Sequence, residues 1–301
     1  MSEITTRNQK KVNEFGDNGG YFDSIVKPIL QYGHEDEFRN WLQDMKLIKS
    51  SLTCSKPDCY EHKLIWQAAR VIDKFVWKCT VCHKNYAIRD ASFFHGIHCD
   101  LKTSIGLILA WCQNIPPQTI ALMLGTQDLN AKKMYKKCTK MADTWVERHI
   151  DEFFLGGPGK VLVIYEYPGG NMLSDVIEIV KTDKHKGHLP IILSMNVIKG
   201  HILPGSFIVA DKNAECYDFN AIVELKNYQT FSIDFLEKFD NDAQKLRDNL
   251  ATIWQSAVDI FEDVVESPKS QRQSILSSYL WRQKFNFQNM LEQIADEYRF
   301  E

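Results

Sequence analysis

Four cysteines in the first third of the chain have the spacing of a metal site. Cys54 and Cys59 are separated by four residues, Cys79 and Cys82 by two, and nineteen residues lie between the pairs. Thiolate pairs at such spacing can close a tetrahedral shell around one zinc ion, and a module held in this way needs little hydrophobic core. A shell of four ligands has no open position, so the sequence predicts a structural Zn²⁺ cofactor in a zinc ribbon.

The sequence leaves two alternatives for these cysteines. The first spacer is wider than the common two residues, so His62 or His83 could replace one thiol as a ligand. An even count of eight cysteines also permits disulfides, but the N-terminal residues carry no basic-then-apolar signal pattern. We therefore expect reduced thiols and an intracellular protein. The four cysteines outside the cluster are scattered: Cys99, Cys112, Cys138 and Cys216.

A lysine stripe on a predicted helix over residues 128–150 is the second group with functional chemistry. The stripe comprises Lys132, Lys133, Lys136, Lys137 and Lys140. Side chains at this spacing share one side of a helix, where their ammonium groups can neutralise the phosphates of double-stranded DNA. Gln127 and Asn130, near the first turn, are predicted to reach base edges. The alternative is the solvated face of an ordinary helical bundle.

Three predicted helices position this stripe. An apolar helix over Leu101–Gln113 is followed by Pro117, which suits a first helical turn, and by a short helix that ends before Gly125. Short helix, glycine turn and longer helix is the pattern of a helix-turn-helix motif. It predicts a DNA-binding region over residues 98–155, preceded by the zinc ribbon over 51–97 and by a helical segment over 1–50 that Gly33 divides.

Residues 156–301 have a different pattern, in which short apolar strands follow a glycine-rich linker. Three strands in a meander, a fourth strand and a helix form the order of a ribonuclease-H-like fold, which is an α/β sheet of mixed direction. The predicted strands cover residues 161–167, 175–182, 189–197, 208–211 and 228–233, with helices over 214–224, 242–265 and 269–298. Three histidines near the turns are expected at the surface: His185, His188 and His201.

Charge and hydropathy agree with a two-part soluble protein. Residues 51–150 carry 14 Lys and Arg against 8 Asp and Glu, whereas residues 151–301 carry 15 against 23. The basic excess suits a front part that faces nucleic acid. No apolar run reaches the roughly 18 residues of a membrane span, so no membrane partner is expected.

With these motifs in view, nearly the full chain resembles the Merlin-type DDE transposases, relatives of a bacterial insertion-sequence family. The resemblance includes the Trp77-Lys78-Cys79-x2-Cys82 knuckle, the helix-turn-helix and the strands that end near Tyr165 and Asp211. It implies three carboxylates that hold two divalent ions for DNA cleavage. The first and third of the corresponding positions hold Tyr165 and Ala251, and only Asp211 matches.

The altered positions predict a catalytically inactive protein. A phenol that is neutral at pH 7 and a methyl group cannot compensate a pair of hard cations, and one carboxylate binds Mg²⁺ poorly. Rescue would need Glu166 to reach the other face of its strand, or Asp248 to act from one turn before Ala251. Asp211 alone is better explained as a cap near Asn213.

The sequence as a whole predicts a domesticated, inactive transposase that binds double-stranded DNA or chromatin in the nucleus. Its degenerate catalytic domain is expected to serve as a scaffold for protein partners or for a homodimer. The alternatives are a protein-binding adaptor without DNA affinity, and an active Mg²⁺-dependent transposase that uses Asp211 with shifted carboxylates.

Overall fold

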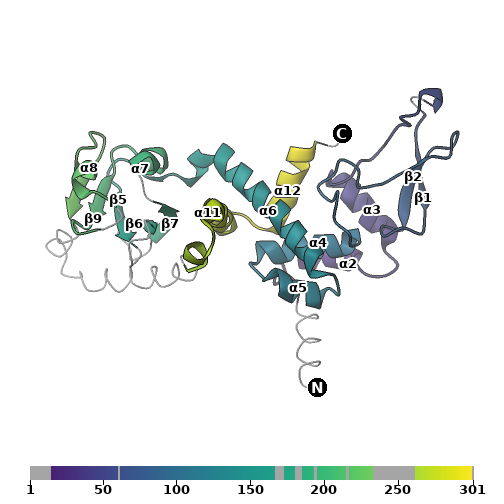
Figure 1. Cartoon of the computed structure of the whole chain (residues 1–301), viewed down its shortest axis with the longest axis horizontal. Coiled ribbons are helices and arrows are strands. Elements are labelled where there is room, and N and C mark those ends of the chain that lie inside the picture. Colours follow the sequence, from purple (N-terminus) through teal and green to yellow (C-terminus); the bar gives the residue numbers. More distant parts are fainter. Residues whose placement is uncertain are drawn as a thin grey trace, which may run out of the picture. The chain divides into compact units, whose positions relative to one another are not determined.

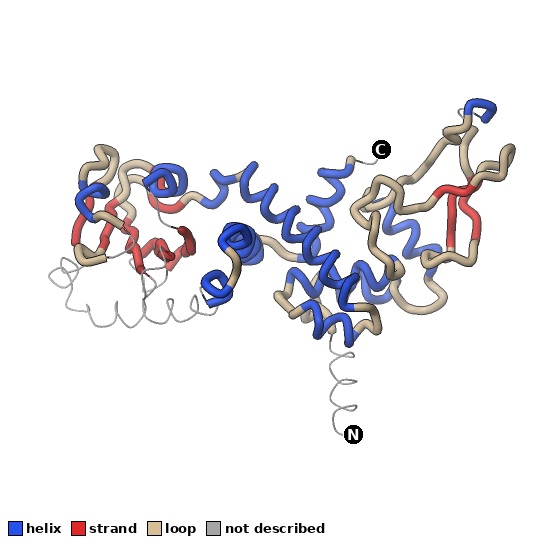
Figure 2. The backbone as a smooth tube through the Cα atoms, in the orientation of Figure 1, coloured by secondary structure: helices blue, strands red, loops and turns tan. Residues whose placement is uncertain are grey.

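The chain folds into two compact units (Figures 1 and 2). The computed structural model describes residues 15–59, 62–166, 173–179, 185–192, 195–214, 217–232 and 262–299. Unit 1 contains residues 1–141 and 284–301, and unit 2 contains residues 142–283. The predicted helical and ribbon segments therefore belong to unit 1, together with residues 98–141 of the predicted helix-turn-helix region, and the boundary lies inside a helix rather than in the glycine-rich linker.

Unit 1 begins with short helical elements. These are η1 (Phe22–Val26), α2 (Lys27–Ile29) and α3 (Glu35–Asp44). Gly33 separates α2 from α3 with φ of +92°, which confirms the predicted division. Phe22 packs edge-on against Phe287 at a centroid distance of 5.5 Å, so the first element contacts the last helix of the chain.

A three-stranded antiparallel sheet follows. Strands β1 (Ile65–Ala68), β2 (Phe75–Lys78) and β3 (Asn85–Tyr86) lie in the order β1-β2-β3. Trp66 pairs with Trp77 in the β1–β2 register, and their rings meet edge-on at 5.0 Å. Most of β1 stays exposed, whereas Val76 and Trp77 of β2 are buried.

Helices α4 (Leu101–Cys112), α5 (Pro117–Met123) and α6 (Asp128–Arg148) complete the predicted motif. Asp100 caps α4 by accepting a hydrogen bond from the Thr103 amide at 2.8 Å, and Pro117 occupies the first turn of α5. Gly125 takes φ of +64° in the turn, a conformation that L side chains rarely adopt. Trp111 donates a hydrogen bond to the Thr139 hydroxyl at 3.2 Å, which joins the buried face of α4 to α6.

The last helix corrects the predicted domain division. Helix α12 (Phe287–Tyr298) packs against α4 and belongs to unit 1, although the sequence placed residues 156–301 in one domain. Its amphipathic face buries Met290, Leu291 and Ile294 against that unit. Helix α11 (Lys269–Lys284) ends before it, because Asn286 starts α12 with a capping box. The predicted helix over 269–298 is therefore two helices.

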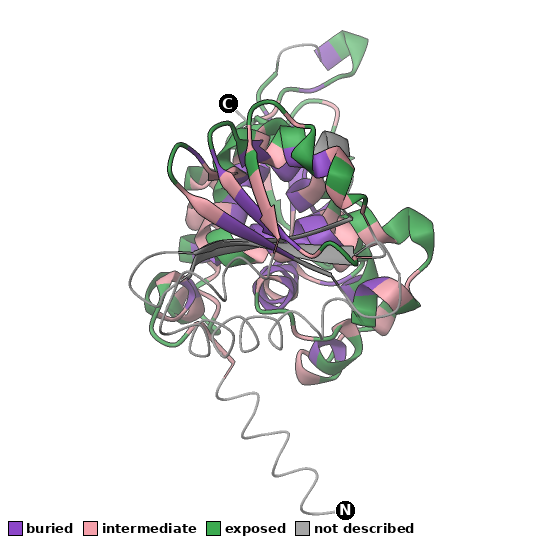
Figure 3. Ribbon diagram, turned by 90° about the vertical axis from the view of Figure 1, so that its left-hand side faces the viewer, coloured by how far each residue is buried: buried purple, intermediate pink, exposed green. Residues whose placement is uncertain are grey.

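Unit 2 contains a five-stranded mixed sheet in the order β10-β9-β5-β6-β7. The strand β5 pairs antiparallel with β6 and parallel with β9, β6 pairs antiparallel with β7, and β10 pairs parallel with β9. Apolar residues of β5 and β9 are buried, as the purple positions of the sheet in Figure 3 show. The strand bounds are β5 Val161–Glu166, β6 Leu173–Ile179, β7 His185–Ile192, β9 Phe207–Ala210 and β10 Gln229–Ser232, with a two-stranded pair of β4 Leu155–Gly156 and β8 Ile202–Leu203.

Two predicted elements in unit 2 have different bounds in the structure. The strand expected over 189–197 begins at His185, because its pairing with β6 continues through an irregularity at Glu178/Ile179, and α7 (Met195–His201) takes its last residues. The helix expected over 214–224 is the shorter α8 (Phe219–Val223), capped by Asp218. The helix predicted over 242–265 lies mostly outside the described residues. No helix of the described ranges is long and apolar enough to cross a membrane.

Candidate functional site

The four predicted cysteines come together at one end of the small antiparallel sheet. Cys54 donates its amide to the His62 carbonyl at 2.9 Å, Cys59 ends the short helix η2 (Pro57–Cys59), and Cys79 follows β2. The turn after Cys79 carries Cys82, whose amide points at the Cys79 sulfur at 3.5 Å. All four sulfur atoms lie within 4.8 Å of one another, and this group could hold a metal ion.

The electrostatics of the cluster are those of crowded thiols. Burial, reinforced by the neighbouring thiols, raises the pKa of Cys59 to about 12. Backbone hydrogen bonding from Cys82 lowers the pKa of Cys79 to about 6. Four thiolates this close repel one another, so the fully ionised cluster requires a cation at its centre.

The alternative histidine ligands lie outside the cluster. His62 and His83 are exposed, and the cluster is formed by cysteine sulfurs alone. The Tyr86 hydroxyl lies 3.2 Å from the Cys54 sulfur and also accepts a hydrogen bond from the Ser55 amide. This contact joins β3 to the first knuckle. Tyr86 was not identified from the sequence, since no spacing rule selects a hydroxyl beside a thiol cluster.

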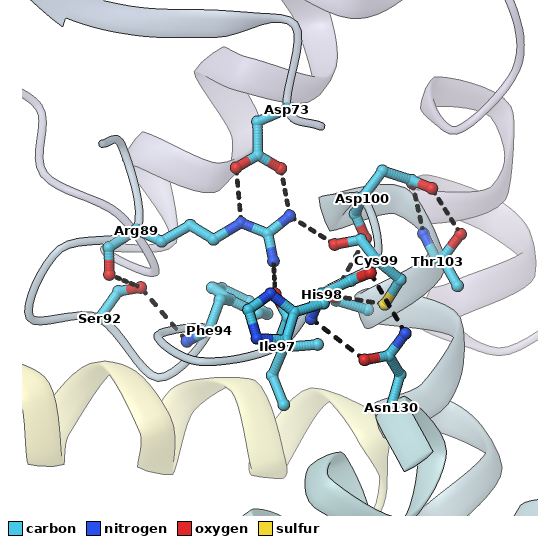
Figure 4. Close-up of polar contacts among 11 residues, drawn as sticks. Asp73, Arg89, Ser92, Phe94, Ile97, His98, Cys99, Asp100, Thr103 and Asn130 are labelled. Carbon is cyan, nitrogen blue, oxygen red and sulfur yellow. Dashed lines mark hydrogen bonds and ion pairs between the residues drawn. The ribbon is translucent and has the colours of Figure 1, made fainter. Parts of the chain in front are cut away.

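A buried polar network connects the ribbon to the helices (Figure 4). Arg89 forms a forked ion pair with Asp73 of the β1–β2 loop, and both side chains are about nine-tenths buried. The same guanidinium donates to the Ile97 carbonyl at 2.7 Å and to the Cys99 carbonyl at 2.5 Å. No local sequence pattern indicates this network, because Asp73 and Arg89 lie 16 positions apart in the chain.

The lysine stripe lies on the exposed side of α6. Lys132, Lys133, Lys136 and Lys140 are exposed, whereas Ala131, Met134 and Cys138 on the same helix are fully buried. Two of the five lysines have intramolecular partners. Lys132 pairs with Asp128 at 2.6 Å, and Lys137 lies 5.5 Å from the centre of the Phe93 ring, where partial burial lowers its pKa.

Asn130 does not face outward, so its predicted contact with base edges was wrong. Only 3% of the residue is exposed. Its side-chain oxygen accepts a hydrogen bond from the backbone amide of His98 at 3.1 Å. Its side-chain nitrogen donates to the His98 carbonyl at 3.2 Å and to the Thr126 hydroxyl at 3.3 Å. Gln127 is exposed, and so is the neighbouring Leu129, which the sequence did not single out.

The two described positions that the resemblance assigns to metal-binding carboxylates are Tyr165 on β5 and Asp211 directly after β9. The parallel register of these strands pairs Val163 with Val209, and β9 ends at Ala210, one residue before Asp211. Glu166 pairs with Ser174 of β6, in a backbone register that is regular from Val161 to Glu166. Ala251 and Asp248 lie outside the described residues.

Asp211 has a local structural role. Its carboxylate accepts a hydrogen bond from the Asn213 amide at 2.8 Å, and its own amide donates to the Tyr217 hydroxyl at 2.8 Å. It therefore closes the turn after β9 rather than capping α8, which begins later with Asp218 as its cap. Elsewhere in unit 2, His201 is more buried than predicted, and burial lowers its pKa.

Comparison with known proteins identifies no relative of this chain. No protein-family model matches the chain, and neither a curated protein nor a solved structure is significantly similar to it. The functional argument therefore depends on the residues and contacts above.

Proposed function

We propose that this protein binds double-stranded DNA through the exposed lysine face of α6 and acts on chromatin in the nucleus as a regulatory or architectural factor. The observation that carries the proposal is the separation of the two sides of α6. One side is buried in unit 1, and the other presents Lys133, Lys136 and Lys140 to solvent. Within the described residues, none of these three lysines forms an ion pair with a carboxylate. Lysines arranged in this way neutralise phosphates.

The proposal includes one structural zinc ion. A tetrahedral site with Zn–S bonds of roughly 2.3 Å needs sulfur atoms about 3.8 Å apart. The Cys54 and Cys82 sulfurs lie 3.7 Å apart, and all four lie within 4.8 Å, so the set fits. Zinc here would fold the ribbon and, with four thiolates around it, would leave no position for a substrate.

For unit 2 we propose a ribonuclease-H-like domain of transposase origin that has lost its chemistry. The strand order and directions support this fold, since three antiparallel strands are extended by two parallel strands on the side of β5. Tyr165 on β5 and Asp211 directly after β9 provide one carboxylate, where two metal ions need several. The domain then serves for contacts with protein partners or a second copy of the chain.

The test of DNA binding is a salt titration with a matched pair of variants. One variant changes the exposed stripe lysines Lys132, Lys133, Lys136 and Lys140 to Gln, and the control changes four exposed lysines of unit 2, Lys199, Lys212, Lys226 and Lys269. Each phosphate contact contributes about 0.9 to the slope of log K against log salt. We expect the stripe variant to reduce the slope by up to about 3.6 and the control to keep it.

The other candidate functions predict different results. Absence of duplex binding by the wild-type protein at low salt would favour an adaptor that binds only proteins. Mg²⁺-dependent nicking of terminal-repeat DNA that Asp211→Asn abolishes would identify an active nuclease. Equal slopes for the stripe variant and its control would exclude α6 as the interface.

A further inference from the structure

The first turn of α6 presents one aliphatic side chain beside its cations. Leu129 is 57% exposed, whereas Asn130 next to it is 3% exposed and fully engaged with His98 and Thr126. The turn therefore offers solvent an apolar group and, at Gln127, an amide. The polar residue best suited to reading a base is turned inward.

Leu129 shares the face of the lysine stripe. Residues three and four apart lie side by side on a helix, so Leu129 neighbours Lys132 and Lys133, and Lys136 follows one turn further. The exposed state of all four residues agrees with this placement. Leu129 therefore lies at the N-terminal end of a cationic surface that is about two to three helical turns long.

This setting favours a nucleic-acid partner over a protein partner. Lysine is depleted in the cores of protein interfaces, because burying an ammonium group among apolar contacts costs solvation free energy. In the major groove, by contrast, phosphates lie beside the base edges, and the 5-methyl group of thymine is the apolar feature there. The leading residues of the second helix in a helix-turn-helix contact base edges.

We propose that Leu129 reads thymine in the major groove through its 5-methyl group, as a specificity-determining residue of this interface. The inference rests on the proposed function, since it requires that α6 bind duplex DNA. In this proposal Leu129 recognises the base by an apolar contact, and the neighbouring lysines supply affinity that does not depend on sequence. Asn130 contributes by fixing the helix and makes no contact with a base.

The experiment compares thymine with uracil, which lacks only the methyl group. Preferred duplexes are selected by the zinc-loaded full chain from a pool with a random centre, and are then synthesised with thymine or uracil. Burying one methyl group is worth about fourfold in affinity, the equivalent of roughly 0.8 kcal/mol. We expect wild-type protein to bind the uracil duplex about fourfold more weakly for each thymine contacted. Leu129→Gln, which keeps helix propensity, is expected to bind both duplexes equally with an unchanged salt slope.

The control is Leu122→Gln, which alters a leucine that is 81% exposed on α5, a helix without lysine. It should keep the thymine preference. Equal binding of both duplexes by the wild-type protein, with a steep salt slope, would overturn the inference and leave the proposed function standing. No duplex binding at low salt would remove both. Loss of the preference in both leucine variants, or a change of oligomeric state in Leu129→Gln with the preference intact, would overturn the assignment to Leu129.

Discussion

Arg89 and Asn130 hold the same three-residue segment, one from the ribbon and one from α6. The Arg89 guanidinium binds the carbonyls of Ile97 and Cys99, and the Asn130 amide binds both backbone groups of His98 between them. Through this segment the ribbon and the helix-turn-helix share one buried polar network. The cysteine-bearing segment and the helix that carries the lysine face are thereby joined by buried polar contacts.

The Asp73–Arg89 pair is expected to be critical for stability. Removing one partner of a buried ion pair costs about 3–5 kcal/mol, because a charge is left buried without compensation. Asp73→Asn should lower the free energy of unfolding by about this amount, and Arg89→Met by at least as much, since two carbonyls also lose their donor. Urea unfolding measures both. The control Asp36→Asn removes an exposed partner of Arg39 and should cost below about 1 kcal/mol. Equal losses for Asp73→Asn and Asp36→Asn would contradict the prediction.

Zinc removal should unfold the ribbon. Structural zinc sites contribute roughly 10–16 kcal/mol of apparent binding free energy, which the small sheet cannot replace. We expect one zinc per chain by elemental analysis, and loss of metal with rapid proteolysis within residues 51–97 for Cys82→Ser. Cys112→Ser, outside the cluster, should retain both the metal and the protection. A metal-free protein with an intact ribbon would refute this.

Unit 2 should lose stability in mild acid through His201. Burial lowers its folded pKa below 6.5, so the folded state binds fewer protons than the unfolded state. Its contribution is complete above pH 6.5 and is lost as pH falls below that value, by at most about 1.4 kcal/mol per pH unit. Since His201 is only partly buried, the loss of stability should be smaller than this upper limit. The free energies of unfolding of the wild-type and His201→Gln proteins, compared at pH 7.5 and 5.5, isolate the contribution of His201. An identical pH dependence for both would rule it out.

Lys136 and Lys137 should differ in their effect on DNA binding although they are adjacent. Lys136 is exposed, whereas Lys137 is partly buried over the Phe93 ring. We expect Lys136→Gln to reduce the salt slope by about 0.9 and Lys137→Gln to reduce it less. Lys137→Gln should instead lower thermal stability by loss of the contact with the ring, worth about 0.5–1 kcal/mol. A larger reduction of the salt slope in Lys137→Gln than in Lys136→Gln would contradict the assignment of the exposed lysine face as the interface.

Asp211 should behave as a turn residue and not as a metal ligand. Asp211→Asn keeps an oxygen that can accept from the Asn213 amide, so its stability should match the wild type. Asp211→Ala should cost about 0.5–1.5 kcal/mol. Calorimetry with Mn²⁺ should show no specific binding in any of the three proteins. Two bound ions per chain that disappear in Asp211→Asn would refute the inactive assignment.

The sequence by itself determined the elements that depend on local pattern. Cysteine spacing identified Cys54, Cys59, Cys79 and Cys82, and helical periodicity with Pro117 and Gly125 located α4 to α6. These features are visible because metal knuckles, helix starts and glycine turns follow from neighbouring residues in the chain. Strand ends in unit 2 were less predictable, since pairing with β6 decided where β7 begins.

Only the tertiary structure decided which of the polar residues, usually exposed by type, are buried. Asn130 resembles a base-reading residue in the sequence, but in the folded chain it satisfies the His98 backbone from 32 positions away. Asp73 and Arg89 are ordinary surface residues by type and become buried partners 16 positions apart. Helix α12 joins unit 1 by packing against α4. In each case the reason is the same: a polar group or an apolar face is buried where a distant segment completes its contacts, and no local pattern encodes that partner.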